Sequence, residues 1–331
     1  MNIPSSMHYI ESKNDPQNMS LATTPIPTLT SGDVLIRVEA AGVSRADIAQ
    51  RKGKYNPPPG ASPILGLDIA GDVVAKDDSV TTFKIGDKVC ALTNGGGYAE
   101  YCAVPATQCL PWPKNYDAIH AAALPENFFT VWANLFQQDQ LKKNESLLVH
   151  GGTSGIGLTA IQLAKEFAGK IYATAGSTEK CQACLAHGAD FAIHYREENF
   201  ETVIHHITKE KGVDVILDMV GAAYFEKNIH CLAINGRLIE IGLLQGSKVE
   251  RFDLAILLAK RLTIMGSTLR ARTTKEKAII AESLYKTVWP VLNQGRCKPV
   301  IDKIFPLKKV TEAHRLMESS QHIGKIILVT E

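Results

Sequence analysis

The stretch SLLVHGGTSGIG, residues 146–157, decides the fold of this chain. It begins with an apolar run short enough for one buried strand, continues into four glycines within seven residues, and leads into LTAIQLAKEFAG, whose apolar residues share one helical face. A dinucleotide pyrophosphate requires such a strand, tight turn and helix, because the backbone must approach the phosphates and helix N-termini attract negative charge. Ser154 replaces the middle glycine of the strict G-x-G-x-x-G pattern, so the assignment needs support from elsewhere.

The composition of the whole chain is that of an ordinary globular protein. Its 331 residues are 45% hydrophobic, which is enough for about two domains with separate cores. The net charge of +2, with Lys and Arg spread along the chain, favours neither nucleic acid nor a membrane surface as a partner. The seven cysteines show no disulfide framework, and the N-terminal residues lack the basic start and apolar segment of a signal peptide. We therefore expect a cytoplasmic protein with reduced thiols.

The order of the predicted elements indicates two kinds of domain. Strand and turn patterns dominate residues 1–124, where the segment 63–75 predicts a pair of short strands. Strands alternate with helices of about ten residues over 125–267, which predicts an α/β fold with a doubly wound parallel sheet. Residues 268–331 carry two helical patterns and a closing strand at Lys325–Val329, too little for an independent core. We expect this tail to complete the N-terminal domain.

The second predicted strand of the parallel sheet indicates which dinucleotide binds. An NAD site usually places an acid about 20 residues beyond the glycines, at the end of this strand. Here the strand end carries Gly176 and Ser177, with Lys180 one turn further on. These residues suit a 2′-phosphate, which an acid would repel. Glu179 is interpreted as part of the first turn of the next helix, where a negative charge suits the helix dipole. The segment therefore predicts NADPH.

Further segments in order along the chain strengthen this interpretation, among them SRADIAQRKGKYNPPPGASPILGLDIAG, KIGDKVCAL, ALPENFFTVWANL, AINGRLIEIG and HIGKIIL. From about Met7 to Val329 the chain resembles the quinone oxidoreductase (zeta-crystallin-like) branch of the medium-chain dehydrogenase/reductase superfamily, and looks closest to its stress-inducible NADPH quinone oxidoreductases. The resemblance implies a GroES-like catalytic domain (1–124 and 268–331), a Rossmann NADPH-binding domain (125–267) and an active site where they meet. It also implies a small-molecule quinone or enone substrate and, commonly, a homodimer formed through the Rossmann sheets.

The resemblance also implies the site residues. Cofactor contacts would be Tyr55, Thr130, Ser154, Gly155, Ile156, Gly176, Ser177, Lys180, Tyr195, Val220, Ile241, Gly242, Leu243, Leu269 and His322. The candidate catalytic residues are Tyr55 and Ser44. Ser44 stands where many relatives carry Asn, and Ala49 where some carry a second tyrosine, so the substrate pocket is expected to be roomier or differently polar than in those relatives.

A catalytic metal is not expected. Zinc-dependent members of the superfamily need a Cys in the first loop and a His-Glu pair after the next glycine, but this chain has Ser44 and Leu67-Asp68 at those positions. Cys90, Cys102 and Cys109 are too few and wrongly spaced for a structural zinc site. Cys181-x-x-Cys184 lies in a helical pattern without a second cysteine pair, which favours packing over metal or redox chemistry. Asp68 is interpreted as a structural carboxylate that pairs with Arg45 or Arg51.

The predicted activity is zinc-independent, NADPH-dependent reduction of quinones or related α,β-unsaturated carbonyls by hydride or electron transfer. Tyr55 is the preferred polar group beside the substrate, because a phenol can donate a hydrogen bond to an oxyanion without ionising near neutral pH. Its alternative role is a turn tyrosine that packs on Pro57–Pro59. Two other functions stay open: an alkenal or enoyl-thioester reductase, and a low-turnover NADPH-binding protein, crystallin-like or RNA-binding, although the near-neutral charge argues against RNA.

Overall fold

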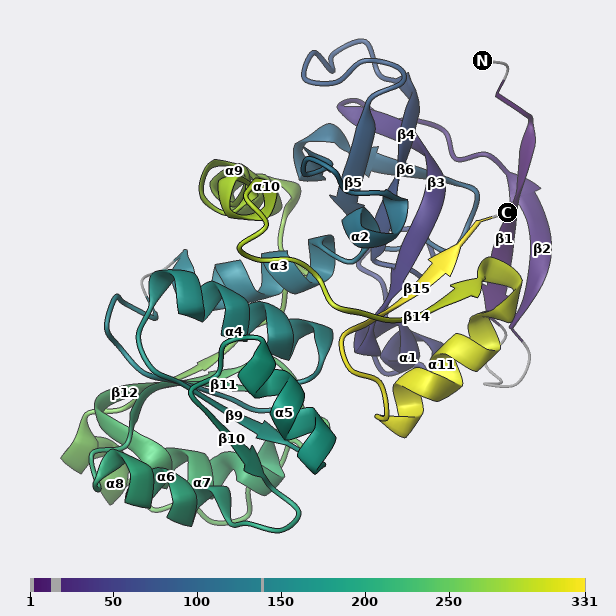
Figure 1. Cartoon of the computed structure of the whole chain (residues 1–331). Helices are drawn as coiled ribbons and strands as arrows, with labels where there is room; N and C mark the ends of the chain where they lie inside the picture. Colours follow the sequence, from purple (N-terminus) through teal and green to yellow (C-terminus); the bar gives the residue numbers. More distant parts are fainter. Residues whose placement is uncertain (1–2, 13–18, 138–139, 331) are drawn as a thin grey trace. The chain divides into compact units, whose positions relative to one another are not determined.

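The computed structural model describes residues 3–12, 19–137 and 140–330, which form two compact units: Met1–Phe129 with Leu269–Glu331, and Thr130–Thr268. The first unit is rich in β-strands and the second is a parallel sheet with helices on both faces, so the predicted α/β fold class is confirmed (Figure 1). The first boundary between the units falls inside helix α3 (Pro125–Val131) rather than before it. Every helix in the described part of the chain is too short or too polar to cross a membrane.

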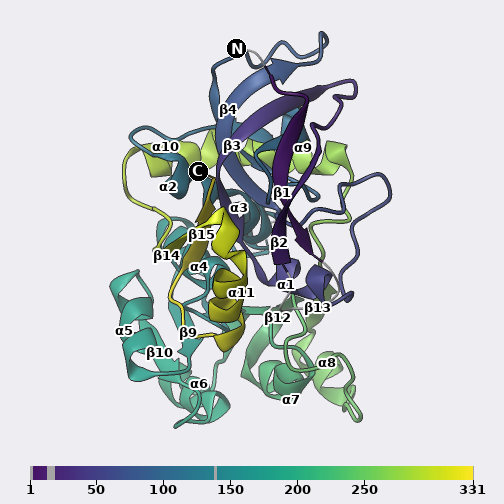
Figure 2. The same ribbon diagram turned by 90° about the vertical axis from the view of Figure 1, so that its right-hand side faces the viewer.

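The second unit contains a six-stranded sheet in the order β10-β9-β8-β11-β12-β13, and all of its strands are parallel. The strands are β8 (Leu147–Val149), β9 (Ile171–Ala175), β10 (Phe191–His194), β11 (Val213–Asp218), β12 (Leu232–Glu240) and β13 (Thr263–Gly266). Figure 2 shows β10 and β13 at opposite ends of this sheet. The strand order reverses between β8 and β11, and open α/β sheets bind their ligands at the carboxyl ends of the strands beside such a reversal.

Five helices cover the two faces of this sheet. They are α4 (Gly155–Phe167), α5 (Thr178–Ala186), α6 (Phe200–Thr208), α7 (Ala222–Cys231) and α8 (Ala255–Lys260). Figure 1 shows α4 and α5 on one face and α6, α7 and α8 on the other. Strands that are buried on both faces need continuous apolar runs, and β8 is such a strand, with all three side chains inaccessible to solvent.

The first unit is built on a seven-stranded sheet in the order β14-β15-β3-β4-β5-β7, with β6 also paired to β3. Its strands are β3 (Asp33–Val43), β4 (Asp68–Lys76), β5 (Lys88–Leu92), β6 (Tyr101–Pro105), β7 (Cys109–Pro111), β14 (Ile301–Pro306) and β15 (Lys325–Val329). A separate two-stranded sheet pairs β1 (Ser6–Ser12) antiparallel with β2 (Met19–Pro25). β15 pairs antiparallel with β3, with Ile326 opposite Val43. The C-terminal segment is therefore part of this sheet.

The remaining helices range from five residues in α2 to 14 in α9. They are α1 (Arg45–Arg51), α2 (Ala118–Ala122), α3 with the π-helical turn Trp132–Phe136 after it, α9 (Thr274–Thr287), α10 (Trp289–Asn293) and α11 (Val310–Ser319). The start of α9 is fixed by a capping box, in which Thr273 and Glu276 each bond the other's backbone N–H. α11 packs on β14 and β15, which connects it to the edge of the sheet.

One strand prediction in the first unit is wrong. Segment 63–75 forms a single strand, β4, because residues 63–67 are a loop. Gly66 in this loop has a φ of +100°, which favours glycine, and a Cβ there would lie 2.7 Å from the backbone of Gly97. The loop therefore packs backbone against backbone on a second loop and leaves no room for a strand pair.

Candidate active site

The glycine-rich turn connects β8 to α4 and needs its glycines for close packing. Gly151 has a φ of +65°, and a Cβ on Gly157 would lie 2.3 Å from the carbonyl oxygen of Gly151. A Cβ on Gly152 would lie 2.7 Å from the sulfur of Cys184. Any larger side chain at these positions would separate the start of α4 from the turn. The backbone N–H groups of the first helical turn are thereby kept close to the strand end, where an anion can approach them.

Ser154 is the N-cap of α4. Its Oγ accepts a hydrogen bond from the N–H of Gly157 at 2.9 Å, while its own hydrogen points to the sulfur of Met219 at 3.8 Å. Gly155 and Ile156, the next two residues, begin the helix and are half-buried. The structure thus places three of the predicted cofactor residues together at the start of α4.

The end of β9 brings four more predicted residues together. Ser177 is the N-cap of α5 and accepts from the N–H of Lys180 at 3.2 Å. A Cβ on Gly176 would lie 2.8 Å from the phenol oxygen of Tyr195, the residue that follows β10. Glu179 is exposed in the first turn of α5, as the sequence predicted. The end of β9 therefore combines the backbone of a glycine with a hydroxyl, an ammonium group and a phenol, which a ligand at this place could contact.

The buried carboxylate of Asp218 fixes the loop after β11 and connects it to helix α7. This carboxylate accepts from the N–H of Val220 at 2.7 Å and of Gly221 at 3.0 Å, and from the side chain of Asn228 at 3.1 Å. Asn228 in turn bonds His150 at 2.7 Å. Sequence reasoning missed this network, whose only signal was an acid at the end of an apolar strand.

Three predicted residues, Ile241, Gly242 and Leu243, follow β12. The N–H of Ile241 donates to the carbonyl of Asp218 at 2.8 Å, and Leu243 is exposed. Glu240, at the end of β12, lies opposite Asp218 in the register of the sheet. Burial and the neighbouring charge of Asp218 raise the pKa of Glu240 to about 8. Since parallel strands end at one edge, the predicted residues after β8, β9, β10, β11 and β12 share that edge.

Ser44 lies in the first unit, in a buried ionic cluster. Its Oγ is 2.8 Å from Nζ of Lys325 and 3.3 Å from Oδ2 of Asp68, and these two charged groups are 2.6 Å apart. The pKa of Lys325 is raised above its ordinary value, because the attraction of the Asp68 charge outweighs the opposing effect of burial. A Cβ on Gly42 would lie 2.7 Å from Lys325, so the long side chain uses the space that this glycine leaves.

The predicted partners of Asp68 are therefore wrong. Arg45 bonds Ser320, and Arg51 bonds Glu318 at 2.8 Å and His314 at 3.0 Å, all on or just after α11. The carboxylate of Asp68 pairs instead with Lys325, because β15 lies beside β3 and brings this lysine to the buried end of β4. Sequence reasoning missed Lys325. Its signal was a lysine at the first position of the otherwise apolar strand KIILV.

A second buried network supports α1, the helix that follows Ser44. The phenol of Tyr98 lies 3.1 Å from Asp47 and 3.2 Å from His314, and the other ring nitrogen of His314 faces Arg51. Arg51 can only donate, so His314 accepts there and carries its proton toward Tyr98. Burial and the charge of Arg51 lower the pKa of His314 to about 3, and burial raises the pKa of Asp47 to about 6. The network therefore holds a neutral imidazole.

Tyr55 is half-buried in the loop after α1, and the guanidinium of Arg270 lies over its ring. The guanidinium carbon lies 5.4 Å from the ring centroid, and the guanidinium donates to the Tyr55 carbonyl at 3.1 Å. Burial raises the pKa of Tyr55, while the charge of Arg270 opposes this shift. Leu269 is half-buried beside Arg270, and His322 is buried between α11 and β15. Thr130, in the second unit, is buried in α3, where its carbonyl accepts from Asn134 at 2.8 Å.

The described residues contain no group of three or more His, Cys, Asp or Glu side chains placed to hold a metal ion. Leu67, at one of the positions where a zinc ligand would be needed, is a buried apolar side chain. All seven cysteines are unpaired as disulfides and buried, and burial raises the pKa of Cys181 and Cys184. Thiols of this kind are poor nucleophiles and poor ligands.

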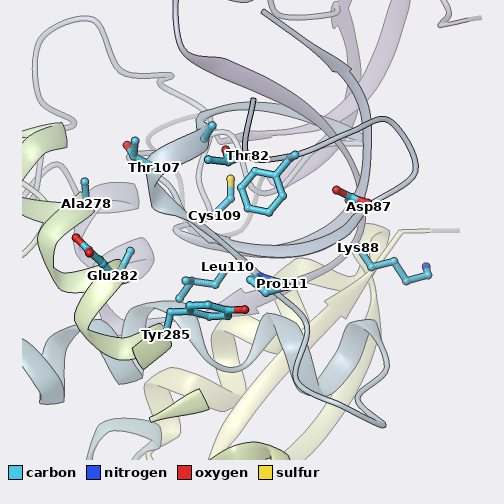
Figure 3. Close-up of a pocket in the computed structure, with 13 residues that line it drawn as sticks. Thr82, Asp87, Lys88, Thr107, Cys109, Leu110, Pro111, Ala278, Glu282 and Tyr285 are labelled. Carbon is cyan, nitrogen blue, oxygen red and sulfur yellow. The ribbon is translucent and has the colours of Figure 1, made fainter. Parts of the chain in front are cut away.

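A separate hollow of about 620 Å³ lies in the first unit (Figure 3). It is lined by Thr82, Phe83, Asp87, Lys88, Ala106, Thr107, Cys109, Leu110, Pro111, Ala278, Ala281, Glu282 and Tyr285, so β7 and the segment before it form one wall and α9 forms another. Apart from the thiol of Cys109, its polar groups stand at the rim on exposed or half-buried residues. None of the predicted site residues lines it.

Two family models match the chain: a zinc-binding dehydrogenase over residues 155–283 and an alcohol dehydrogenase GroES-like domain over residues 30–114. A quinone oxidoreductase of Rattus norvegicus is 33% identical over 306 residues, 92% of this chain and 91% of the relative. Among solved structures, Escherichia coli quinone oxidoreductase complexed with NADPH has a TM-score of 0.85 and 28% identity, covering 98% of this chain and 99% of that one. An NAD-dependent alcohol dehydrogenase has a TM-score of 0.86 and 28% identity, covering 98% and 100%. The chain therefore belongs to the quinone oxidoreductase family of the medium-chain dehydrogenase/reductase superfamily.

Proposed function

We propose that this oxidoreductase reduces quinones with NADPH and without zinc. The observation that carries the proposal is the buried cluster of Ser44, Asp68 and Lys325, because Ser44 and Asp68 stand at positions where zinc-dependent relatives need the Cys and the His-Glu pair. The ammonium group of Lys325 neutralises Asp68 and would repel a second cation at this point. The chemistry then depends on the cofactor and on nearby polar groups.

The pyrophosphate half of a dinucleotide fits the turn between β8 and α4. Gly151 and Gly157 allow close approach to the backbone, and the N–H groups at the start of α4 favour an anion. The hydroxyl hydrogen of Ser154 is directed at the sulfur of Met219, which is a weak acceptor. We propose that a phosphate oxygen takes this hydrogen bond when the cofactor binds.

The 2′-phosphate of NADPH fits the end of β9. Gly176, Ser177 and Lys180 lie there together, with the phenol of Tyr195 beside Gly176. A hydroxyl and an ammonium group suit a phosphate, and the acid in this segment, Glu179, is exposed on α5. One solved relative was complexed with NADPH while another is described as NAD-dependent, so the preference rests on these residues of this chain.

The nicotinamide half is proposed to contact the loops after β11 and β12. The residues are Val220, Ile241, Gly242 and Leu243, with Thr130, Leu269 and His322 as further contacts. When bound, NADPH supplies a hydride, and one proton from solvent completes the conversion of a quinone to a hydroquinone. The Asp218 carboxylate fixes the loop after β11, and backbone hydrogen bonds such as that from Ile241 to the Asp218 carbonyl hold the loop after β12 against it, so a bound cofactor is kept oriented without a protein nucleophile.

Tyr55 is the residue that we propose to contact the substrate. A phenol can donate a hydrogen bond to the quinone oxygen on which negative charge develops, and it stays un-ionised because burial raises its pKa. Ser44 is a different case, since its hydroxyl already bonds Lys325 and Asp68. We propose that Ser44 fixes the start of α1, on which the Tyr55 loop depends, and that it does not itself donate to the substrate.

A substrate panel tests the proposed function. Purified protein with NADPH should oxidise the cofactor in the presence of ortho- or para-quinones, at rates far above the uncatalysed reaction. Turnover of alkenals or enoyl thioesters, but not quinones, would assign the protein to that other class of reductase. No turnover with any of them, despite measurable NADPH binding, would identify a low-turnover binding protein and contradict the proposal.

We also propose a homodimer formed through the second unit. β13 is the last strand of its sheet, and apolar side chains are exposed around it, including Ile264, Leu254 and Leu258, which is 81% exposed. An exposed strand edge with apolar neighbours favours pairing with another chain. Light scattering should give twice the mass of one chain, and Leu258→Glu should weaken the dimer; a wild-type monomer at micromolar concentration would refute it.

A further inference from the structure

Arg270 is a buried cation, 5% exposed, that connects three segments of the first unit. Its guanidinium donates to the carbonyl of Tyr55 at 3.1 Å, to Gln50 at the end of α1 at 2.8 Å, and to the carbonyl of Asn94 at 2.6 Å and 3.2 Å. The planar fork of an arginine can make several such bonds at once, which a lysine cannot. Arg270 therefore fixes the Tyr55 loop against two other elements.

Lys277 supports Arg270 from α9. Its side chain is inaccessible to solvent, and Nζ donates to the carbonyl of Arg270 at 2.8 Å and to the side-chain oxygen of Asn94. Burial and the charge of Arg270 lower the pKa of Lys277 to about 8. The hydrogen-bond partners found for these two cations within the described residues are neutral oxygens. Two carboxylates act on these cations through their charge, Asp47 on Arg270 and Glu276 on Lys277, and among the described residues neither is hydrogen-bonded to its cation. The positive charge of Arg270 therefore also acts on its other neighbours.

The ring of Tyr55 lies close enough to the guanidinium of Arg270 to interact with its charge. The guanidinium carbon of Arg270 is 5.4 Å from the ring centroid, within the range of a cation–π interaction. A nearby cation stabilises a phenolate and also any negative charge that forms on an oxygen bonded to the phenol. Three further effects act on the pKa of Tyr55: burial and the carboxylate of Glu126 oppose ionisation, and a hydrogen bond with the backbone of Arg270 favours it.

We propose that Arg270 is a positioning residue for quinone reduction, which holds Tyr55 in place and makes its phenol a stronger hydrogen-bond donor to the substrate oxygen. The role rests on the proposed function, because it requires Tyr55 to contact the substrate. It differs from a purely structural role in one respect. The effect of Arg270 on turnover must pass through the Tyr55 hydroxyl, whereas a structural role would act equally when that hydroxyl is missing.

A double-mutant cycle separates the two roles. Arg270→Gln and Tyr55→Phe should each lower kcat for a quinone about tenfold, roughly the loss of one hydrogen bond to a charged group, and the double variant should resemble Tyr55→Phe alone. Arg270→Lys, which keeps the charge, should recover part of the loss. Arg296→Gln, the same change at an exposed site of the first unit, should have no effect. Independent losses that multiply in the double variant would overturn the proposal.

A titration tests the inference without turnover. In protein carrying ¹³C-labelled tyrosine, the Tyr55 resonance is identified by its absence from Tyr55→Phe and followed against pH. Removing a cation at this distance should raise the phenol pKa by about one unit in Arg270→Gln and by less in Arg270→Lys. An unchanged value in both variants would overturn the inference. If wild-type protein fails to reduce quinones but Arg270→Gln still raises the pKa of Tyr55, the proposed function is refuted while the link between Arg270 and Tyr55 stands.

Discussion

Asp68 and Lys325 form a buried ion pair, with Nζ 2.6 Å from Oδ2, although 256 residues separate them in sequence. Both side chains are almost inaccessible to solvent, so neither charge can be hydrated if the other is removed. Lys325→Met should therefore destabilise the protein by about 3–5 kcal/mol, the cost of an uncompensated buried charge. Urea unfolding measures this, and Asp68→Leu/Lys325→Met should recover much of the loss. A single variant as stable as wild type would contradict the pairing.

The glycine-rich turn gives a second prediction, about shape. Gly157→Ala would place a Cβ 2.3 Å from the carbonyl oxygen of Gly151, and backbone atoms cannot move aside as a flexible side chain can. The variant should lose dinucleotide binding by at least tenfold in a fluorescence titration. Gly266→Ala in β13 is the matched control, because an added Cβ there meets nothing within 4 Å and binding should not change. If both variants bind the dinucleotide equally well, the turn is not part of the cofactor site.

The choice of cofactor depends on Lys180. Lys180→Ala removes the ammonium group proposed to bind the 2′-phosphate, and loss of such a contact costs roughly 1.5–3 kcal/mol, which is about tenfold or more in affinity. NADPH should weaken by this factor while NADH changes little. Lys211→Ala, at an exposed site after α6, should leave both dissociation constants unchanged. A similar loss for the two cofactors would mean that Lys180 does not contact the 2′-phosphate.

Glu240 gives a prediction about pH. Burial and the charge of Asp218 raise its pKa to about 8 in the folded protein, whereas an unfolded chain releases this proton near pH 4.5. Between these values only the folded state holds the proton, so the contribution of Glu240 to stability is full below about pH 4.5 and declines until pH 8. Glu240→Gln should remove this decline and melt higher than wild type at pH 8–9. Parallel melting curves over pH 5–9 would show that Glu240 titrates normally.

Much of the second unit could be predicted from periodicity alone. Most strands of this sheet are short apolar runs, and the helices between them carry one apolar face, so these patterns are local and self-consistent. β12, LAINGRLIE, is the exception, since it is longer and includes Asn235 and Arg237. In the first unit β2, β7 and β14 escaped prediction, and β5 lies in KIGDKVCAL, whose sequence predicts a turn. β2 reads MSLATTP, β7 has three residues and β14 includes two charged residues, so none has a clear apolar alternation. Their pairing partners, rather than their own residues, make them strands.

The candidate site was predictable where the residues are close in sequence and not where they are distant. Ser177 as an N-cap and Glu179 in the first turn of α5 follow from local rules. The partner of Asp68 could not be found in the same way, because only the pairing of β15 with β3 brings Lys325 to it. Likewise Arg270 could not be placed over Tyr55 from spacing, since a buried cation that binds carbonyls has no sequence signature.

The most direct test of the account is quinone reduction by metal-free protein. The protein is dialysed against a strong chelator, its zinc content is measured by elemental analysis, and kcat with NADPH and a quinone is compared before and after. Full activity is expected with zinc far below one atom per chain, because Lys325 already neutralises Asp68 beside Ser44. Activity that disappears on chelation and returns in proportion to added zinc would contradict it.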